Sequence, residues 1–147
     1  MAPETKTQEE NALVPAFESL TRHVHWGLRA GLAGIFLFHG LGKFATAPTM
    51  AAEMGMPVAA IYMLGALEAG GALLLLAGGF GKELLTRIGA LLFIPVMLGA
   101  IAMVHWPRWS FTATDSHPMG GMEFQVLVIL VSLYLVVKGN AVGGKSV

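Results

Sequence analysis

The chain has 147 residues and a mass of 15.5 kDa, which fits one domain, and 55% of its residues are hydrophobic whereas only 12% are charged. Soluble domains carry about 25% charged residues, so the composition excludes an ordinary soluble protein. Nine basic residues balance nine acidic ones, and this lack of a basic excess argues against nucleic-acid binding. The absence of cysteine excludes disulfides, thiolate metal sites, iron–sulfur ligation and a cysteine nucleophile.

The first 25 residues are more polar and acidic than the rest, and they lack the features of a secretion signal, so we expect this tail to be retained. Asn11 and Pro15 are typical of a helix start. Apolar residues then recur at helical spacing, at Leu13, Phe17, Leu20 and Val24. This pattern predicts a short amphipathic helix on the membrane surface, with a partly disordered tail as the alternative.

Four apolar segments of membrane-spanning length follow, at about residues 26–44, 58–80, 88–106 and 122–137. A helix needs about 20 apolar residues to cross a bilayer core. The runs are continuous and rich in Leu and Ala, unlike the alternating strands of an outer-membrane barrel. The sequence therefore predicts an all-α fold, a bundle of four transmembrane helices in a lipid bilayer. Its organisation would be a tail (1–25), a membrane domain (26–139) and a short C-terminal tail (140–147).

The distribution of Lys and Arg around the predicted spans indicates their orientation, because basic residues collect on the cytoplasmic side. Only Lys43 and Arg108 fall on one side of the membrane. The others fall on the opposite side: Lys6, Arg22, Arg29, Lys82, Arg87, Lys138 and Lys145. Both termini are therefore predicted to be cytoplasmic, with the 46–57 and 107–121 connections outside and the 78–87 turn inside.

Glu68 is the most informative polar residue, because it lies near the middle of the second predicted span, where a lipid-facing carboxylate is costly. Small residues at helical spacing around it, Gly65, Gly71 and Ala72, predict that Glu68 points into the bundle. A cation from the first span would then pair with it, either Lys43 or Arg29, with His39 as a neighbour. Such a pair could be purely structural, or Glu68 could belong to a proton or quinone site.

The predicted topology brings four residues from three spans to one depth: His39, Lys43, His105 and Glu123. Together with Glu68 they could hydrogen-bond a quinone carbonyl and exchange protons with it. Trp106, Trp109 or Phe124 could form an aromatic wall for the quinone ring, although Trp residues at this depth are also typical of an interfacial belt.

The histidines fit a haem or metal site less well than a quinone site. Two histidines on separate spans could ligate a b-type haem, but the spans offer no further matched pair and Lys43 lies one turn after His39. His23 and His25 are two residues apart and diverge on a helix, so the sequence predicts no metal site.

The sequence HGLGKF at residues 39–44, preceded by Arg29, resembles the signature of the DoxX family. Met122 departs from the family pattern, in which an aromatic residue is common before the carboxylate of the fourth span. The resemblance covers about residues 26–139. Further residues similar to that family follow in order: Gly55, Pro57, Glu68, Gly70, Gly71, the Leu73–Leu76 run, Gly79, Phe80, Arg87, Gly89, Ala90, Met97, His105, Gly121, Glu123 and Phe124.

The resemblance implies a multi-pass protein of the inner (cytoplasmic) membrane of bacteria or archaea, associated with quinone-linked sulfur or thiol oxidation or with terminal oxidases. It implies no particular reaction for this chain. One hypothesis is an accessory redox subunit with a quinone pocket, whose electrons come from a partner. The alternative is a non-catalytic anchor or scaffold whose buried charges fix helix register. Either would work with membrane or peripheral protein partners or as a homo-oligomer, and Gly27, Gly31 and Gly34 offer a small-residue face for such packing.

Overall fold

The computed structural model describes residues 4–141, which are helical apart from the connections between the helices, where Thr114 and His117 form an isolated β-bridge. In this part of the chain, helix α1 (Glu4–Met54) is followed by α2 (Val58–Gly78) and α3 (Glu83–Ala100). A short π-helix, η1 (Ile101–His105), extends α3, and α4 (Glu123–Lys138) follows after a long connection. The all-α prediction is confirmed for the described residues.

Three helical segments in the described part of the chain are long and apolar enough to cross a membrane. They are His23–Met54 in α1, Val58–Gly78, which is α2, and Glu83–His105, which combines α3 and η1. The predicted fourth span coincides with α4, which has 16 residues. At about 1.5 Å per residue α4 is about 24 Å long, less than the roughly 30 Å of a hydrocarbon core, so length separates it from the other three.

The first helix is longer than predicted at both ends. It begins at Glu4, so Asn11 is not its N-cap, and the acidic residues of the tail favour this earlier start because they complement the positive end of a helix. It also continues through most of the 46–57 connection predicted to be a loop. There Ala47 and Ala51 pack against Ile61 of α2, and this burial stabilises the extra turns.

The end of α1 is a glycine-terminated cap. Gly55 has a φ of +63°, which residues with a side chain rarely adopt, and the Met56 N–H donates to the Ala51 carbonyl at 2.9 Å. Pro57 follows and cannot continue the helix. The connection to α2 is therefore much shorter than predicted. The 78–87 turn is also shorter than predicted, because α3 already begins at Glu83.

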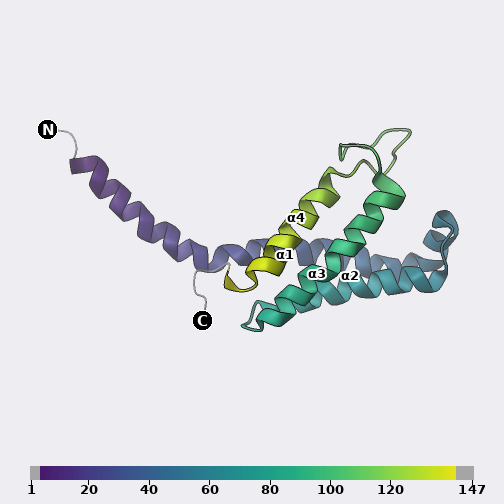
Figure 1. The fold of residues 1–147 in the computed structure, drawn as a ribbon, viewed down its shortest axis with the longest axis horizontal. Coiled ribbons are helices and arrows are strands. Elements are labelled where there is room, and N and C mark those ends of the chain that lie inside the picture. Colours follow the sequence, from purple (N-terminus) through teal and green to yellow (C-terminus); the bar gives the residue numbers. More distant parts are fainter. Residues whose placement is uncertain (1–3, 142–147) are drawn as a thin grey trace.

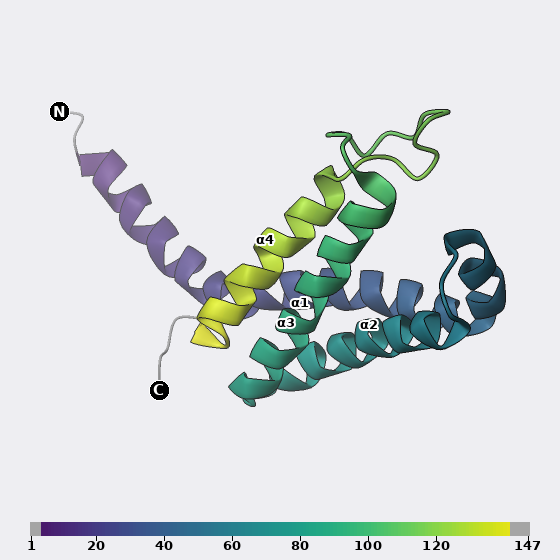
Figure 2. The same ribbon diagram turned by 45° about the vertical axis from the view of Figure 1, so that its right-hand side comes forward.

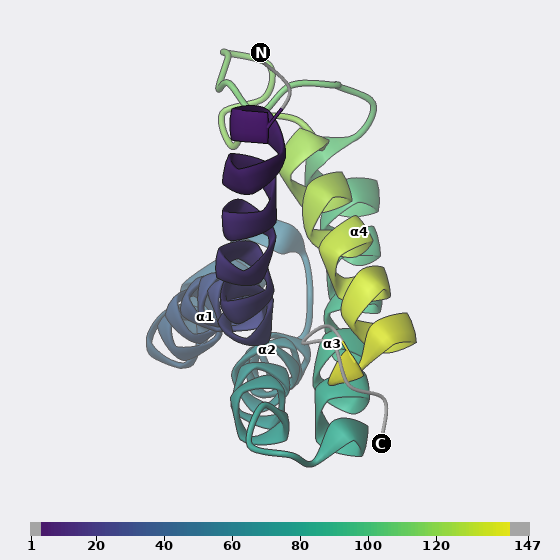
Figure 3. The same ribbon diagram turned by 90° about the vertical axis from the view of Figure 1, so that its left-hand side faces the viewer.

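The helices form two antiparallel pairs that cross obliquely (Figures 1 and 2). Helix α1 packs against α2, α2 against α3, and α3 against α4. Figure 3 looks nearly along α1 and α2 and shows α3 and α4 lying side by side across them. Phe36 of α1 and Phe93 of α3 stack at 3.7 Å between ring centroids and form the centre of the core. The two pairs therefore share one core, but the connection between α1 and α2 and the connection between η1 and α4 lie apart (Figure 1).

Glycines set the distance between α1 and α2. A Cβ atom on Gly40 would lie 2.8 Å from the Ala69 backbone nitrogen, and one on Gly65 would lie 2.9 Å from the Gly40 carbonyl oxygen. The two backbones are thus in direct contact, as small residues allow in membrane helices. Gly27, Gly31 and Gly34 do not serve this purpose, because nothing described lies within 4 Å of a Cβ placed on them. Their small-residue face points away from the described part of the chain.

Candidate functional site

Lys43 and Glu68 form a buried ion pair between α1 and α2. The Lys43 Nζ lies 2.7 Å from Glu68 Oε2, and the two side chains are 11% and 4% exposed. The Gly40–Gly65 contact decides this pairing, because it places the next turn of α1 directly opposite Glu68. Glu68 therefore points into the bundle, and its charge is balanced inside the chain.

The other members predicted around Glu68 lie elsewhere. His39 is exposed on α1, and its carbonyl oxygen is 3.5 Å from Lys43 Nζ. Arg29 does not pair with Glu68. It is 14 residues before Lys43, about 21 Å along a helix at 1.5 Å per residue, which is beyond side-chain reach.

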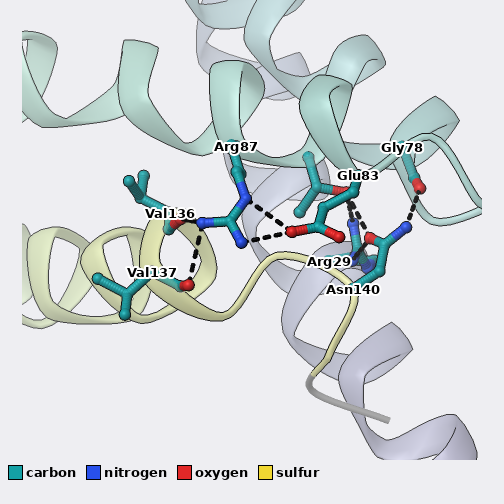
Figure 4. A network of polar contacts seen from close by, with 8 residues as sticks. Arg29, Gly78, Glu83, Arg87, Val136, Val137 and Asn140 are labelled. Atoms are coloured by element: carbon teal, nitrogen blue, oxygen red, sulfur yellow. Dashed lines mark hydrogen bonds and ion pairs between the residues drawn. The ribbon is translucent and has the colours of Figure 1, made fainter. Parts of the chain in front are cut away.

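Arg29 is instead fully buried where all four helices meet (Figure 4). Its Nη1 donates to the Leu75 carbonyl at 2.9 Å and to Thr86 Oγ1 at 2.8 Å, and its Nη2 donates to Asn140 Oδ1 at 2.8 Å. Its Nε donates to His25 Nδ1 at 3.1 Å. These four acceptors come from α1, α2, α3 and the residues after α4, and none of the four is a carboxylate, so Arg29 holds the helices together through hydrogen bonds.

Hydrogen bonds also hold the C-terminal end of α4 in the region around Arg29. The Asn140 amide nitrogen donates to the Gly78 carbonyl at 3.0 Å, and Thr86 Oγ1 donates to Asn140 Oδ1 at 2.8 Å. Arg87 donates to the carbonyls of Val136 and Val137 in the last turn of α4 and pairs with Glu83 (Figure 4). A cation at a helix C-terminus satisfies carbonyl oxygens that have no partner in the helix.

His105 is held at the opposite end of the α3–α4 pair. Its Nδ1 lies 3.0 Å from the Gly120 carbonyl oxygen, which can only accept, so Nδ1 carries the proton. Its Nε2 then accepts from the Gln125 amide nitrogen at 2.8 Å. Both ring nitrogens of this buried histidine are used within the chain.

Glu123 lies nearby, at the start of α4, but does not contact His105. Its Oε2 accepts the Phe111 N–H at 3.1 Å. The carboxylate borders an open groove of about 540 Å³ whose other lining side chains are apolar or aromatic: Trp109, Phe111, Phe124, Val126, Leu127 and Leu130. Trp109 and Phe124 thus line a groove beside Glu123, whereas the exposed Trp106 does not.

The five residues predicted for a quinone pocket thus fall into two groups. His39, Lys43 and Glu68 lie on the α1–α2 pair, and His105 and Glu123 lie at the loop end of the α3–α4 pair. Among the described residues, no hydrogen bond or ion pair given by the structure joins the groups. Sequence reasoning missed Thr86, Gln125 and Asn140. The polar Gln125 and Ser132 inside an apolar run gave a signal for buried partners on α4, but Asn140 lies beyond the helix and gave none.

The comparisons with known proteins identify a similarity to a protein family. The model of the DoxX family matches residues 26–106, 81 of the 147 residues and therefore more than half of the chain. The match contains α2, α3, η1 and the part of α1 that carries Arg29 and Lys43. No curated protein and no solved structure matches the chain.

Proposed function

This chain belongs to the DoxX family of membrane proteins, and from that premise we propose that it is an accessory subunit of a quinone-linked redox assembly. The assembly would be of the sulfur- or thiol-oxidising or terminal-oxidase type, in the inner membrane of a bacterium or archaeon. Electrons would come from a membrane or peripheral partner protein, because the chain has no cysteine to carry them.

The observation that carries the proposal is the groove at the loop end of α4. It combines apolar walls along α4 with three aromatic rings and one carboxylate, Glu123. A quinone is an amphiphile with a flat ring and an apolar tail, and aromatic side chains stack on flat rings. The groove thus matches both parts of the molecule. The groove is not lined by the other residues predicted for the quinone pocket: His39, Lys43, Glu68 and His105.

We further propose that α4 is a fourth membrane span and that both termini are cytoplasmic. Helix α4 lies antiparallel beside α3, so it covers nearly the same depth (Figure 1). A short apolar helix is accommodated by local thinning of the bilayer at modest cost. Four spans place both chain ends on one side, and seven of the nine basic residues favour the cytoplasm for that side.

Cysteine labelling in intact cells will test this topology. Thr112, in the connection before α4, and Lys82, in the turn before α3, are both exposed. The chain has no cysteine, so single replacements have no background. The Thr112→Cys variant should react with a membrane-impermeant maleimide, and the Lys82→Cys variant should react only after permeabilisation. Labelling of the Lys82→Cys variant from outside would contradict the proposed orientation.

Purification in a gentle detergent, with measurement of the mass and of the extracted quinone, will test the function. We expect the chain to copurify with partner proteins and with quinone. Leu130→Trp should fill the groove and lower the quinone content severalfold. Leu133→Trp is the matched control, because Leu133 is also an exposed leucine of α4 but does not line the groove. Quinone content unchanged by Leu130→Trp, or a bare monomer that alone oxidises or reduces a quinone analogue, would contradict the proposal.

A second function, a non-catalytic scaffold, is favoured by the way the buried polar groups are used. Glu68 is neutralised by Lys43, and His105 is satisfied by Gly120 and Gln125. Groups engaged in this way fix helix register. A scaffold would copurify with the same partners but contain no quinone, so the same experiment separates the two functions.

A further inference from the structure

We infer that the groove at the start of α4 binds the reduced form of its ligand, the quinol, more tightly than the quinone, and that Glu123 determines this preference. The inference rests on the proposed quinone-linked function and deepens it. It depends on which hydrogen-bonding groups the groove presents and which groups each form of the ligand carries.

Two of the residues that line the groove have side chains that can form hydrogen bonds. One is the Glu123 carboxylate and the other is the indole N–H of Trp109, and the remaining lining side chains are apolar. A carboxylate in its charged form only accepts hydrogen bonds, whereas an indole N–H only donates. A ligand therefore needs a hydrogen-bond donor to bind the carboxylate and an acceptor to bind the indole N–H.

Two features of the structure suit the Glu123 carboxylate to accept hydrogen bonds. The Phe111 N–H donates to Oε2 at 3.1 Å, so one oxygen already acts as an acceptor. Glu123 is also the first residue of α4, where backbone N–H groups have no partner in the helix and acidic side chains are favourable. Within the described part of the chain the Glu123 carboxylate has a hydrogen bond at Oε2 alone, and we assign Oε1 to the ligand.

The two redox forms of the ligand differ at their oxygen atoms. A quinone has two carbonyl oxygens, which only accept, so a carbonyl placed against the Glu123 carboxylate brings two acceptors together. A quinol has two hydroxyl groups, and one of them can donate to Oε1. The Trp109 indole does not discriminate, because both a carbonyl and a hydroxyl oxygen accept its N–H. The discrimination therefore falls on Glu123.

The rest of the groove is suited to either form. Val126, Leu127 and Leu130 extend from Glu123 along α4 and provide apolar contact for the tail. Phe111 and Phe124 contribute aromatic rings to the lining. Because these contacts are common to both forms, removing the acceptor at position 123 should alter the preference without abolishing binding.

Equilibrium binding of a tritium-labelled, decyl-tailed benzoquinone and of its quinol will test the inference. The full-length protein is placed in phosphatidylcholine nanodiscs under argon, and empty nanodiscs provide the background. We expect the wild type to bind the quinol about tenfold more tightly than the quinone, as one hydrogen bond to a charged group predicts. Glu123→Gln should bring the ratio close to one, because the glutamine amide can donate to a quinone carbonyl. Glu123→Asp, which keeps the carboxylate, should retain a preference for the quinol.

Glu53→Gln provides the matched control, since Glu53 is an exposed carboxylate near the end of α1 and does not line the groove. It makes the same change of charge and should leave the ratio at its wild-type value. Equal binding of quinone and quinol by the wild type would overturn the inference but leave the proposed function intact. Binding of neither form would overturn both. Quinol binding that is present in phosphatidylcholine nanodiscs but lost in phosphatidylethanolamine nanodiscs would show that the lipid ammonium headgroup is the hydrogen-bond donor that Glu123 binds. This result would also overturn the inference.

Discussion

Replacement of Arg29 by methionine is expected to lower the free energy of unfolding by about 3 kcal/mol. Arg29 is fully buried and donates to Leu75, Thr86 and Asn140, which belong to three other parts of the chain. Methionine has similar length but no donors. The three acceptors would lose this donor in the interior, and each acceptor left without a partner there costs about 1 to 3 kcal/mol.

Lysine at position 29 should restore only part of the stability that is lost in Arg29→Met, because its charged group has a different shape. In Arg29→Lys a single ammonium group replaces a planar fork that reaches acceptors on several helices. Unfolding by sodium dodecyl sulfate in mixed micelles will measure the differences. Arg87→Met is the control, because Arg87 also donates to backbone carbonyls but its side chain is 39% exposed, and we expect its replacement to cost about 1 kcal/mol. Equal stability of the Arg29→Met variant and the wild type would contradict the role of Arg29 as the joint between the helices.

Glu68→Gln is expected to destabilise the protein by about 3 to 5 kcal/mol, because it leaves the Lys43 ammonium buried without a counter-charge. The double variant Lys43→Met with Glu68→Leu should be nearly as stable as the wild type, since it removes both charges and fills the space with apolar groups. The Lys43 and Glu68 side chains are 11% and 4% exposed, so neither can exchange its partner for water.

The surface pair between Glu83 and Arg87 is a matched comparison for the buried one. Its side chains are 50% and 39% exposed, and exposed pairs contribute about 0 to 1 kcal/mol. Glu83→Gln should therefore have little effect in the same unfolding assay. The role assigned to the buried pair fails if Glu68→Gln costs no more than Glu83→Gln, or if the double variant is as unstable as Glu68→Gln alone.

The direction of Glu68 could be predicted from the sequence, because the glycines and alanine around it on one helix face are local information. Its partner could not be chosen on the same basis. Lys43 and Arg29 lie on nearly the same face of α1, and only the contact between Gly40 and Gly65 sets which of them is level with Glu68. Register between helices depends on where two surfaces fit, and this fit is a property of both helices together.

The residues of the candidate site could likewise be predicted from the sequence only in part. The sequence indicated Glu123 and the aromatic residues near it, since a carboxylate beside aromatic residues at the end of an apolar run is visible in one dimension. It also predicted that His39, Lys43 and His105 would share a level with Glu123. His105 and Glu123 do lie at the same end of the α3–α4 pair, whereas His39 and Lys43 lie on the α1–α2 pair. The two pairs cross obliquely, and helix crossing angles follow from how the side chains of facing helices interdigitate (Figure 2).

The composition and the apolar runs of the sequence by themselves determined the helical membrane class, because the cost of burying polar backbone in lipid leaves few alternatives. They also determined where the apolar cores of the helices lie. Only the tertiary structure decided that Arg29 binds Thr86 and Asn140, 57 and 111 residues away, and that Gln125 satisfies His105. Hydrogen bonds between residues so far apart in the chain form only where packing brings the helices together, so no local pattern encodes them.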